Sequence, residues 1–232
     1  MNPVSNNNDK QNLLCERSND KCLFLNEIEE LRKEVSSLTE LVRTDALTGL
    51  YNFRFFNETL SLEMERTRRG TQPLSMILLD IDYFKKFNDT WGHEIGNHAL
   101  VHIANLIKAA IRKLDFPCRF GGEEFVILLP NTDLRQAAQV AERLREMIAT
   151  SPLEIASQGP ITITASLGVD QFTAAHTETC ETFINRVDRW LYQSKDKGRN
   201  QVTYPDLNTR KEADSVTLEE KNALFGAVGN ED

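Results

Sequence analysis

Two acidic clusters in the sequence are suited to hold a divalent cation. The first is the segment 121–125, Gly-Gly-Glu-Glu-Phe, which precedes an apolar run at 126–129. Its two glycines tolerate a positive φ and predict the tip of a β-hairpin, where the bare backbone also lets a ligand approach closely. Glu123 and Glu124 repel each other unless a positive charge lies near them. A solvated acidic turn would account for the segment taken alone, whereas a metal ion that carries phosphates would account for its carboxylates.

The second acidic cluster favours the metal site. The largely apolar run 74–79 predicts a central strand, and Asp80 and Asp82 stand at its carboxyl end. Carboxylates at the end of a buried strand, beside a hairpin that bears two more, are typical of a two-metal phosphoryl-transfer site. We therefore expect the two clusters to lie together in the folded protein.

The composition narrows the class of protein. The chain has 232 residues, of which 40% are hydrophobic and 27% charged, enough for one domain with a sizeable core and extensions. A net charge of -8 argues against nucleic acid as a partner. No apolar run approaches the roughly 18 residues of a membrane helix, and the polar segment 2–11 is no secretory signal, so we expect a cytoplasmic protein without a membrane span. The four cysteines lack paired metal spacing, and we expect them to be reduced.

The composition also divides the chain into parts. Residues 1–22 are rich in Asn, Asp, Lys and Ser and are expected to be disordered, and 206–232 form a polar tail. Residues 23–44 predict a coiled-coil stalk that joins two chains into a homodimer, because their apolar positions alternate in spacings of four and three. These positions are Phe24, Ile28, Leu31, Val35, Leu38 and Val42. A single amphipathic helix packed on its own domain is the alternative.

The remaining part, 45–205, predicts a compact domain in which helices and strands mix. Helices are expected at 53–69, 95–114, 134–149 and 179–194, and strands at 74–81, 161–169 and 201–204 in addition to the hairpin. This order favours an α/β (α+β) fold with a ferredoxin-like sheet that is flanked by helices.

Five separated motifs in this domain occur in the order typical of one family. They are Asp45-x-Leu47-Thr48-Gly49-Leu50-x-Asn52, Asp80-x-Asp82-x-Phe84-Lys85-x-x-Asn88-Asp89, Gly92-His93-x-x-Gly96, Gly121-Gly122-Glu123-Glu124-Phe125 and Lys195-x-x-Gly198-Arg199-Asn200. From Asp45 to about Tyr204 the sequence resembles a GGDEF-domain diguanylate cyclase. The resemblance implies a palm-type nucleotidyl-cyclase sheet and a homodimer in which two GTP-loaded domains face each other. It also implies that two GTP condense into cyclic di-GMP with release of two pyrophosphates.

The resemblance assigns roles to the residues of both acidic clusters. Asp80, Glu123 and the Ile81 carbonyl would hold two Mg²⁺ ions, with Mn²⁺ as a substitute, because Mg²⁺ prefers hard oxygen ligands and phosphates complete its shell. Glu124 would be a further ligand or a proton acceptor. Cations would bind the β- and γ-phosphates of GTP, and glycines would let the backbone lie against them. These residues are Lys85, Lys195 and Arg199, with Gly121 and Gly122.

Base recognition departs from the family pattern at one position. Asn88 would read guanine together with an Asp that follows the Gly-His-x-x-Gly motif, but this second position is Asn97. An ionised Asp accepts two hydrogen bonds from guanine, whereas an Asn amide offers one acceptor and one donor. We expect either relaxed base selection, with cyclic GMP-AMP as a further product, or an unchanged product despite the substitution.

Arg112 and Asp115 match the family's Arg-x-x-Asp inhibitory site, which binds dimers of the product. An Arg fork and an Asp carboxylate suit the phosphates and guanine edges of cyclic di-GMP. Arg143 on the following helix is a further candidate for this site. Taken without the family, Arg112 and Asp115 are an ordinary charge pair at a helix end. With the family spacing to Gly121 preserved, product inhibition is the expectation.

Two other kinds of function agree with parts of the sequence. A non-catalytic receptor for cyclic di-GMP would keep the Arg-x-x-Asp pair but lose turnover, and the intact acidic and basic residues argue against it. An interaction module would bind a regulatory protein on the stalk, between Phe24 and Val42. Such binding is compatible with catalysis. We expect no sensor domain before the stalk, so a bound protein would supply the input signal.

Overall fold

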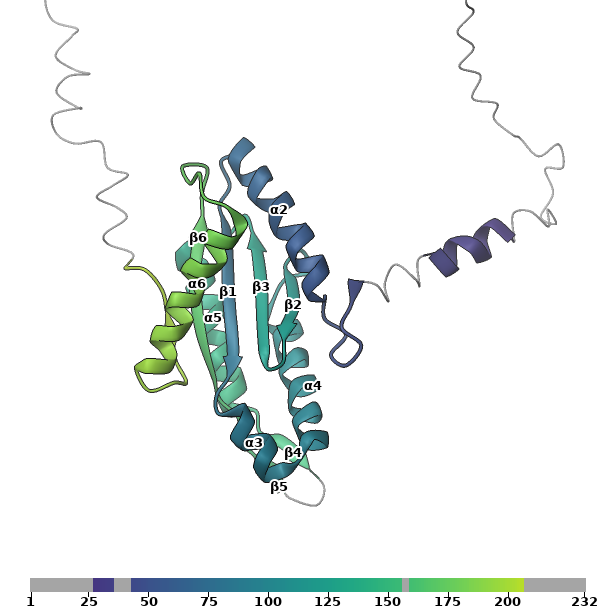
Figure 1. Cartoon of the computed structure of the whole chain (residues 1–232), viewed down its shortest axis with the longest axis vertical. Coiled ribbons are helices and arrows are strands. Elements are labelled where there is room, and N and C mark those ends of the chain that lie inside the picture. The colour runs from purple at the N-terminus through teal and green to yellow at the C-terminus, as the bar shows by residue number, and fades with distance from the viewer. Residues whose placement is uncertain (1–26, 36–42, 156–158, 207–232) are drawn as a thin grey trace, which may run out of the picture. The chain divides into compact units, whose positions relative to one another are not determined.

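The computed structural model describes residues 27–35, 43–155 and 159–206 (Figure 1). The chain divides into two units, Met1–Val42 and Arg43–Asp232, which are described separately below. Within the described ranges, none of the helices is both long and apolar enough to cross a membrane.

In the first unit, residues 27–35 form a helix. It carries three of the predicted seam positions, Ile28, Leu31 and Val35, and all three side chains are exposed. The other seam positions lie outside the described residues, as do 1–22 and almost all of the tail. The coiled-coil stalk, the disorder of the N-terminus and the polar tail therefore stay predictions.

The second unit is built on a five-stranded sheet. Its strands are β1 (Leu74–Ile81), β2 (Phe116–Gly121), β3 (Glu124–Pro130), β6 (Ala165–Phe172) and β7 (Val202–Thr203), in the order β2-β3-β1-β6-β7. β1 lies at the centre and runs antiparallel to β3 and β6, whereas β7 is parallel to β6. A separate small sheet pairs β4 (Leu153–Ile155) with β5 (Gly159–Ile161).

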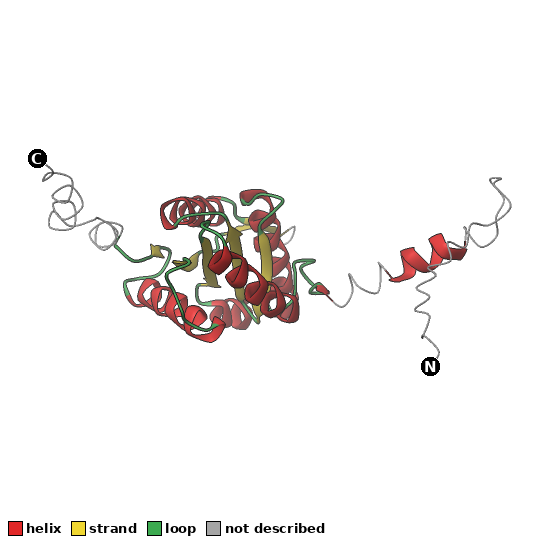
Figure 2. Ribbon diagram, turned by 90° about the horizontal axis from the view of Figure 1, so that it is seen from above, coloured by secondary structure: helices red, strands yellow, loops and turns green. Residues whose placement is uncertain are grey.

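Helices cover both faces of the large sheet (Figures 1 and 2). The helices are α2 (Phe53–Arg69), α3 (Phe84–Trp91), α4 (His93–Ala110), α5 (Leu134–Thr150) and α6 (Cys180–Asp196). α4 and α5 share one hydrophobic core with the sheet, and α2 and α6 share the other. The central sheet, its strand order and its flanking helices confirm the predicted fold class.

β1 belongs to both cores, because successive residues of a strand point to opposite faces. Ile77 and Leu79 pack toward α4 and α5, whereas Met76 and Leu78 pack toward α2 and α6. All eight residues of the strand are buried. Burial of each large apolar side chain contributes about 1.5–3 kcal/mol, so β1 is a firm base for the carboxylate near its end, Asp80.

The long helix that we predicted over 95–114 is shorter at its carboxyl end. α4 ends at Ala110, and the Asp115 carboxylate accepts a hydrogen bond from the Arg112 backbone N–H at 2.7 Å. The Asp115 N–H in turn donates to the Arg112 carbonyl oxygen at 3.1 Å. These two bonds close a turn, so the Arg-x-x-Asp pair lies in a loop before β2 and not in a helix.

Two further elements differ from the prediction. α3 was not predicted, and it occupies the segment between β1 and α4. The strand expected at 161–169 is split into β5 and β6, and residues 162–164 belong to neither. The interruption has a local cause, because the Thr164 carbonyl and hydroxyl both bond to Asp82 instead of to a strand.

Candidate active site

The two predicted acidic clusters meet at one edge of the sheet. Asp80 on β1 lies directly opposite Glu124, the first residue of β3. The Ile81 N–H donates to the Glu123 carbonyl oxygen at 3.4 Å, which holds the hairpin tip against the end of β1. Gly122 at the tip has a φ of 50°, the conformation that the paired glycines predict.

The carboxylates at this edge carry more negative charge than their surroundings neutralise. Burial raises the pKa of Asp80, and the negative charges of Glu123 and Asp82 raise it further. The contact with Lys195 lowers this pKa but does not cancel the rise. The distance from Lys195 Nζ to Asp80 Oδ2 is 2.8 Å. One lysine thus faces several acidic groups, and the excess charge favours binding of a cation.

Glu124 lies in a similar environment. Burial raises its pKa, the charge of Asp80 raises it further, Lys195 opposes the rise, and Glu123 and Asp188 add to it. Asp188 belongs to α6 and lines a cavity of about 260 Å³ together with Glu124. Sequence analysis missed this α6 carboxylate, because no motif connects it with the hairpin.

Asp82 belongs to the same cluster but is already saturated with hydrogen bonds. It is 8% exposed and accepts from the hydroxyls of Thr164 at 2.7 Å and Ser166 at 2.6 Å. It also accepts from the backbone N–H of Asn200 at 3.0 Å. Its carboxylate therefore joins β1, β6 and the turn after α6, and a structural role accounts for it fully.

The hairpin tip is held by Arg119, a residue that sequence analysis missed. Its Nε and Nη2 donate to the Gly122 carbonyl oxygen at 3.1 and 2.8 Å, and its Nη1 lies 3.2 Å from both carboxylate oxygens of Asp45. Asp45 also accepts from the N–H and hydroxyl of Thr48. Although partial burial opposes it, these bonds and the charge of Arg119 lower the pKa of Asp45.

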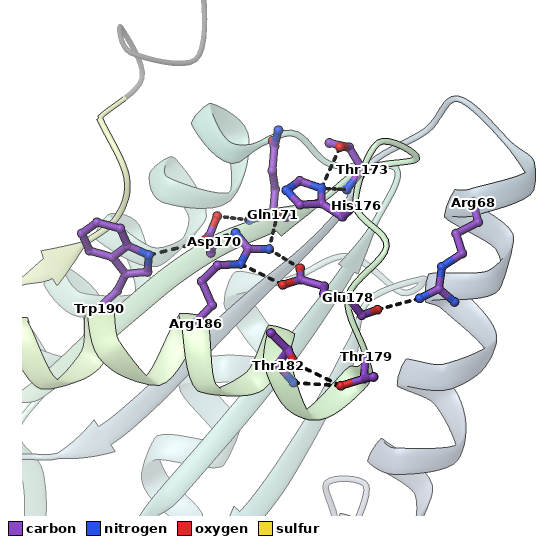
Figure 3. A network of polar contacts seen from close by, with 10 residues as sticks. All are labelled: Arg68, Asp170, Gln171, Thr173, His176, Glu178, Thr179, Thr182, Arg186 and Trp190. Atoms are coloured by element: carbon purple, nitrogen blue, oxygen red, sulfur yellow. Dashed lines mark hydrogen bonds and ion pairs between the residues drawn. The ribbon is translucent and has the colours of Figure 1, made fainter. Parts of the chain in front are cut away.

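α6 is tied to β6 by a polar network (Figure 3). The Arg186 guanidinium lies 2.5 Å from Asp170 and 2.6 Å from Glu178, and the Trp190 indole N–H donates to Asp170 at 3.2 Å. Asp170 is only 1% exposed, so the loss of Arg186 would leave a buried charge without its cation. The network fixes α6 along the sheet and places Lys195, in the last turn of the helix, over the acidic cluster.

The other two predicted phosphate-binding cations lie around the same end of β1. Arg199 follows α6 and donates from Nη1 to the Tyr83 hydroxyl at 3.2 Å. Lys85 is exposed in the first turn of α3, two residues after Tyr83. Lys195 and Arg199 thus come from the end of α6 and the turn after it, and Lys85 comes from α3, the helix that follows β1.

Asn88 on α3 carries a buried side-chain oxygen without a hydrogen-bond partner among the described residues. Gly96 on α4 makes room for it, since a Cβ at that position would lie 1.9 Å from the Asn88 Oδ1. An unsatisfied buried acceptor costs about 1–3 kcal/mol, which a ligand that donates a hydrogen bond would recover. Asn97, the next residue on α4, is exposed. Of the two residues predicted to read the base, only Asn88 shows this sign of a missing ligand.

Arg112, Asp115 and Arg143 line one cavity of about 210 Å³. Arg143 reaches it from α5 and donates from Nη2 to the Ala110 carbonyl oxygen at 2.5 Å. Burial raises the pKa of Asp115, and its hydrogen bond and charge contact with Arg112 oppose the rise. The structure thus brings the three predicted inhibitory residues together.

A second cavity of about 460 Å³ also has Arg112 and Asp115 in its wall and adds Arg66 from α2. Sequence analysis missed Arg66, because it is one of several basic residues at the end of α2 and nothing in the spacing singles it out.

Residues 42–201 match the family model described as "Diguanylate cyclase, GGDEF domain". The response regulator PleD of Caulobacter vibrioides is 42% identical over 173 residues, which cover 74% of this chain and 38% of PleD. The chain therefore spans well under half the length of that relative.

Two solved structures show the same fold. The coiled coil and GGDEF domain of DgcB from Caulobacter crescentus, in complex with c-di-GMP, superposes with a TM-score of 0.73 at 30% identity, over 78% of this chain and 95% of that one. The diguanylate cyclase SiaD from Pseudomonas aeruginosa, in complex with its activator SiaC, gives 0.70 at 36% identity, over 78% and 69%. The sequence, the fold and the position of the acidic hairpin all point to one family. The chain belongs to the GGDEF domain family of diguanylate cyclases.

Proposed function

We propose that the protein is a diguanylate cyclase, which condenses two GTP into cyclic di-GMP and releases two pyrophosphates. The observation that carries the proposal is the convergence of Asp80, Glu123 and Glu124 with Lys195 at the end of β1. Three carboxylates and a lysine can hold a cation and a phosphate chain side by side. Family membership makes GTP the expected substrate.

The acidic cluster fits Mg²⁺, with Mn²⁺ as a substitute. Within the described ranges no group of three or more His, Cys, Asp or Glu side chains is arranged to enclose a metal by itself. Mg²⁺ usually binds to one or two carboxylates and takes its other ligands from phosphates and water. Asp80, Glu123 and the Ile81 carbonyl would hold two such ions. At this site Mg²⁺ supplies acidification of a 3′-hydroxyl and neutralisation of charge on an α-phosphate.

The protein's own groups orient the substrate. Lys195, Arg199 and Lys85 bind the β- and γ-phosphates, and Gly121 and Gly122 let the backbone lie against them. Lys85 comes from α3, Lys195 from the last turn of α6 and Arg199 from the turn after it, so the triphosphate would be bound from more than one side. The same cations would stabilise the negative charge of the pyrophosphate as it leaves.

One carboxylate, that of Glu124, and one amide, that of Asn88, complete the reaction site. Glu124, with its raised pKa, suits acceptance of the proton from the attacking hydroxyl. Asn88, with its buried and unpartnered oxygen, suits recognition of a donor on the base. One domain supplies one such set of groups, so condensation of two GTP needs a second copy that faces the first.

A direct test compares GTP turnover in Mg²⁺ between the wild type and Glu123→Ala. The wild type should form cyclic di-GMP, identified by mass spectrometry, and the variant should lose turnover by at least about 100-fold because it loses a metal ligand. Glu146→Ala, on the exposed face of α5, is the matched control and should keep wild-type turnover. A wild type that binds cyclic di-GMP but forms none would instead support a non-catalytic receptor.

The cavity between α4 and α5 supports product inhibition. Arg112, Asp115 and Arg143 offer two guanidinium groups and a carboxylate, which complement the phosphates and guanine edges of cyclic di-GMP. The relative DgcB was solved in complex with c-di-GMP. Arg112→Ala should leave turnover intact and weaken inhibition by added product about 10-fold or more, as loss of a charge-assisted contact predicts. Unchanged inhibition in this variant would refute the assignment of Arg112 to an inhibitory site.

A second candidate function follows from Asn97, an exposed amide where the family pattern has a carboxylate. An amide can pair with guanine or with adenine, so mixed cyclic GMP-AMP is the candidate product. Equimolar GTP and ATP with Mg²⁺, followed by mass spectrometry, separates the cases. Pure cyclic di-GMP would show that Asn97 leaves base selection unchanged.

The stalk at 23–44 would bring two cyclase domains together and offer a surface to a regulatory protein. The relative SiaD was solved with its activator SiaC, and the matched DgcB structure includes a coiled coil. In this chain, Ile28, Leu31 and Val35 are exposed along one helix, at spacings that suit a partner helix.

A further inference from the structure

Strained backbone gathers beside the acidic cluster. Tyr83, directly after Asp82, has a φ of 55°, and Arg199 and Asn200 have φ values of 64° and 45°. Among non-glycine residues of the described ranges, Asn131 is the only other with a positive φ. Such conformations cost free energy and persist where the surrounding structure enforces them. Their concentration at one place indicates that the local geometry matters.

The two strained segments are fastened to each other by Asp82. Its Oδ2 accepts from the Asn200 backbone N–H at 3.0 Å and from the Thr164 hydroxyl at 2.7 Å. The carboxylate therefore holds the turn after α6 against the end of β1. This contact brings the side chains of Tyr83 and Arg199 to the same place.

The Tyr83 side chain then holds the Arg199 guanidinium by two contacts. The Arg199 Cζ lies 4.3 Å from the centre of the Tyr83 ring, and its Nη1 donates to the Tyr83 hydroxyl at 3.2 Å. The ring covers one face of the planar guanidinium, and the hydrogen bond to the Tyr83 hydroxyl uses Nη1 and not Nε or Nη2. The N–H edge of a guanidinium is the part of an arginine that binds phosphate oxygens in pairs.

We propose that Tyr83 is a positioning residue that holds Arg199 ready for the β- and γ-phosphates and so favours GTP over guanine nucleotides that lack them. The inference rests on the proposed function, from which it takes the role of Arg199. A surface arginine that is free to rotate loses side-chain entropy when it binds a ligand. Tyr83 removes part of that loss before the nucleotide arrives. Tyr83 is itself 62% exposed, so packing in the core does not explain the residue.

The test measures binding of two nucleotides to the full chain in Mg²⁺ by calorimetry. One is guanosine 5′-(α,β-methylene)triphosphate, which cannot release pyrophosphate, and the other is GMP. Tyr83→Ala should weaken binding of the triphosphate about 5- to 10-fold and leave GMP binding unchanged. Tyr83→Phe keeps the ring and should lose only about 2-fold. Tyr192→Ala removes another exposed tyrosine, on α6, and should change neither affinity.

A double-mutant cycle shows whether Tyr83 acts through Arg199. In an Arg199→Ala background, the additional change Tyr83→Ala should cause no further loss of triphosphate affinity. Three results would overturn the inference: wild-type affinity in Tyr83→Ala, an equal loss for both nucleotides, or a full additional loss on top of Arg199→Ala.

The same measurements separate this inference from the proposed function. A wild type that binds the triphosphate but never forms cyclic di-GMP would refute the proposed function, and the ratio of the two affinities would still decide the role of Tyr83. An active wild type with an unchanged ratio in Tyr83→Ala would refute the role of Tyr83 alone. A wild type that fails to bind the triphosphate would overturn both.

Discussion

Asp80 and Glu124 face each other across β1 and β3, and both have a raised pKa, mainly because they are buried. Each raised pKa means that the folded protein holds the proton more tightly than the unfolded chain does. Stability from these groups is therefore present at low pH and is lost as the pH rises through the raised pKa values. Around neutral pH, without a cation, the site destabilises the fold that carries it.

Glu124→Gln should therefore stabilise the metal-free protein while it impairs turnover. At pH 7 the unfolding midpoint should rise by about 2 °C, as a change of under 1 kcal/mol in a domain of this size predicts. Near pH 4 the difference should shrink, because the wild-type carboxyl is then largely protonated. Thermal unfolding in a chelator at both pH values measures this, with Glu146→Gln as the exposed control. A midpoint at pH 7 equal to or below that of the wild type would contradict the prediction.

At the scale of elements, the hairpin that carries Glu123 and Glu124 depends on one side chain. Arg119 joins the Gly122 carbonyl at the hairpin tip to the Asp45 carboxylate in the turn before α2. A lysine has a single charged group and cannot make both contacts at once. The geometry of the catalytic hairpin is thus tied to a turn more than 70 residues earlier in the chain.

Arg119→Lys should lower turnover more than it lowers stability. Loss of the two-pronged guanidinium contact costs about 1–3 kcal/mol of hydrogen bonding, and a loosened tip would displace Glu123, the proposed metal ligand. We expect a fall in kcat of about 10-fold or more, with the unfolding midpoint lowered by only a few degrees. Steady-state kinetics and thermal unfolding measure the two effects. Arg135→Lys on the exposed face of α5 is the control, and equal kcat values for the two variants would refute the role of Arg119.

Local signals made several elements predictable from the sequence. The N-cap of α2 is Asn52, whose side chain accepts from the Phe55 N–H, and the N-cap of α5 is Asp133, which forms a capping box with Gln136. The apolar run that ends in carboxylates predicted β1. The bounds of α2 and β1 agree with the prediction residue for residue.

The elements that the sequence did not predict depend on distant partners. α3 starts at Phe84, and its N-cap residue, Tyr83, has a left-handed conformation and makes no side-chain capping bond, so no local start signal exists. The break before β6 exists because Thr164 bonds to Asp82, 82 positions away. In the site, the motif residues were found because spacing marks them. Arg119 and Tyr83 were missed because their importance appears only in contact with Asp45 and Arg199.

At the scale of the whole molecule, the proposed reaction needs two copies of the domain. A stalk that joins two chains raises the local concentration of one domain near the other to about the millimolar range. Without it, turnover would depend on chance encounters. The dependence of activity on protein concentration would therefore measure what the predicted stalk contributes.

Deletion of residues 1–40 should give a monomer with low activity at micromolar protein. Turnover per chain should fall by about 10-fold or more and should recover as the protein concentration rises, because encounter becomes limiting. Sedimentation and GTP turnover over a range of concentrations measure both effects. Deletion of 207–232 is the control and should leave them unchanged. Dimerisation and turnover like those of the full chain would exclude the stalk as the dimer contact.

The saturated carboxylate of Asp82 has a consequence for how inactive variants are interpreted. A genetic screen for loss of cyclase signalling would score Asp80→Ala and Asp82→Ala alike, because both abolish the signal. The first should accumulate as folded protein, whereas the second leaves Thr164, Ser166 and the Asn200 N–H without their shared acceptor. Its defect should be visible as reduced soluble yield and faster proteolysis in the cell. Two aspartates with identical phenotypes would thus report on different properties, one on chemistry and the other on the lifetime of the protein.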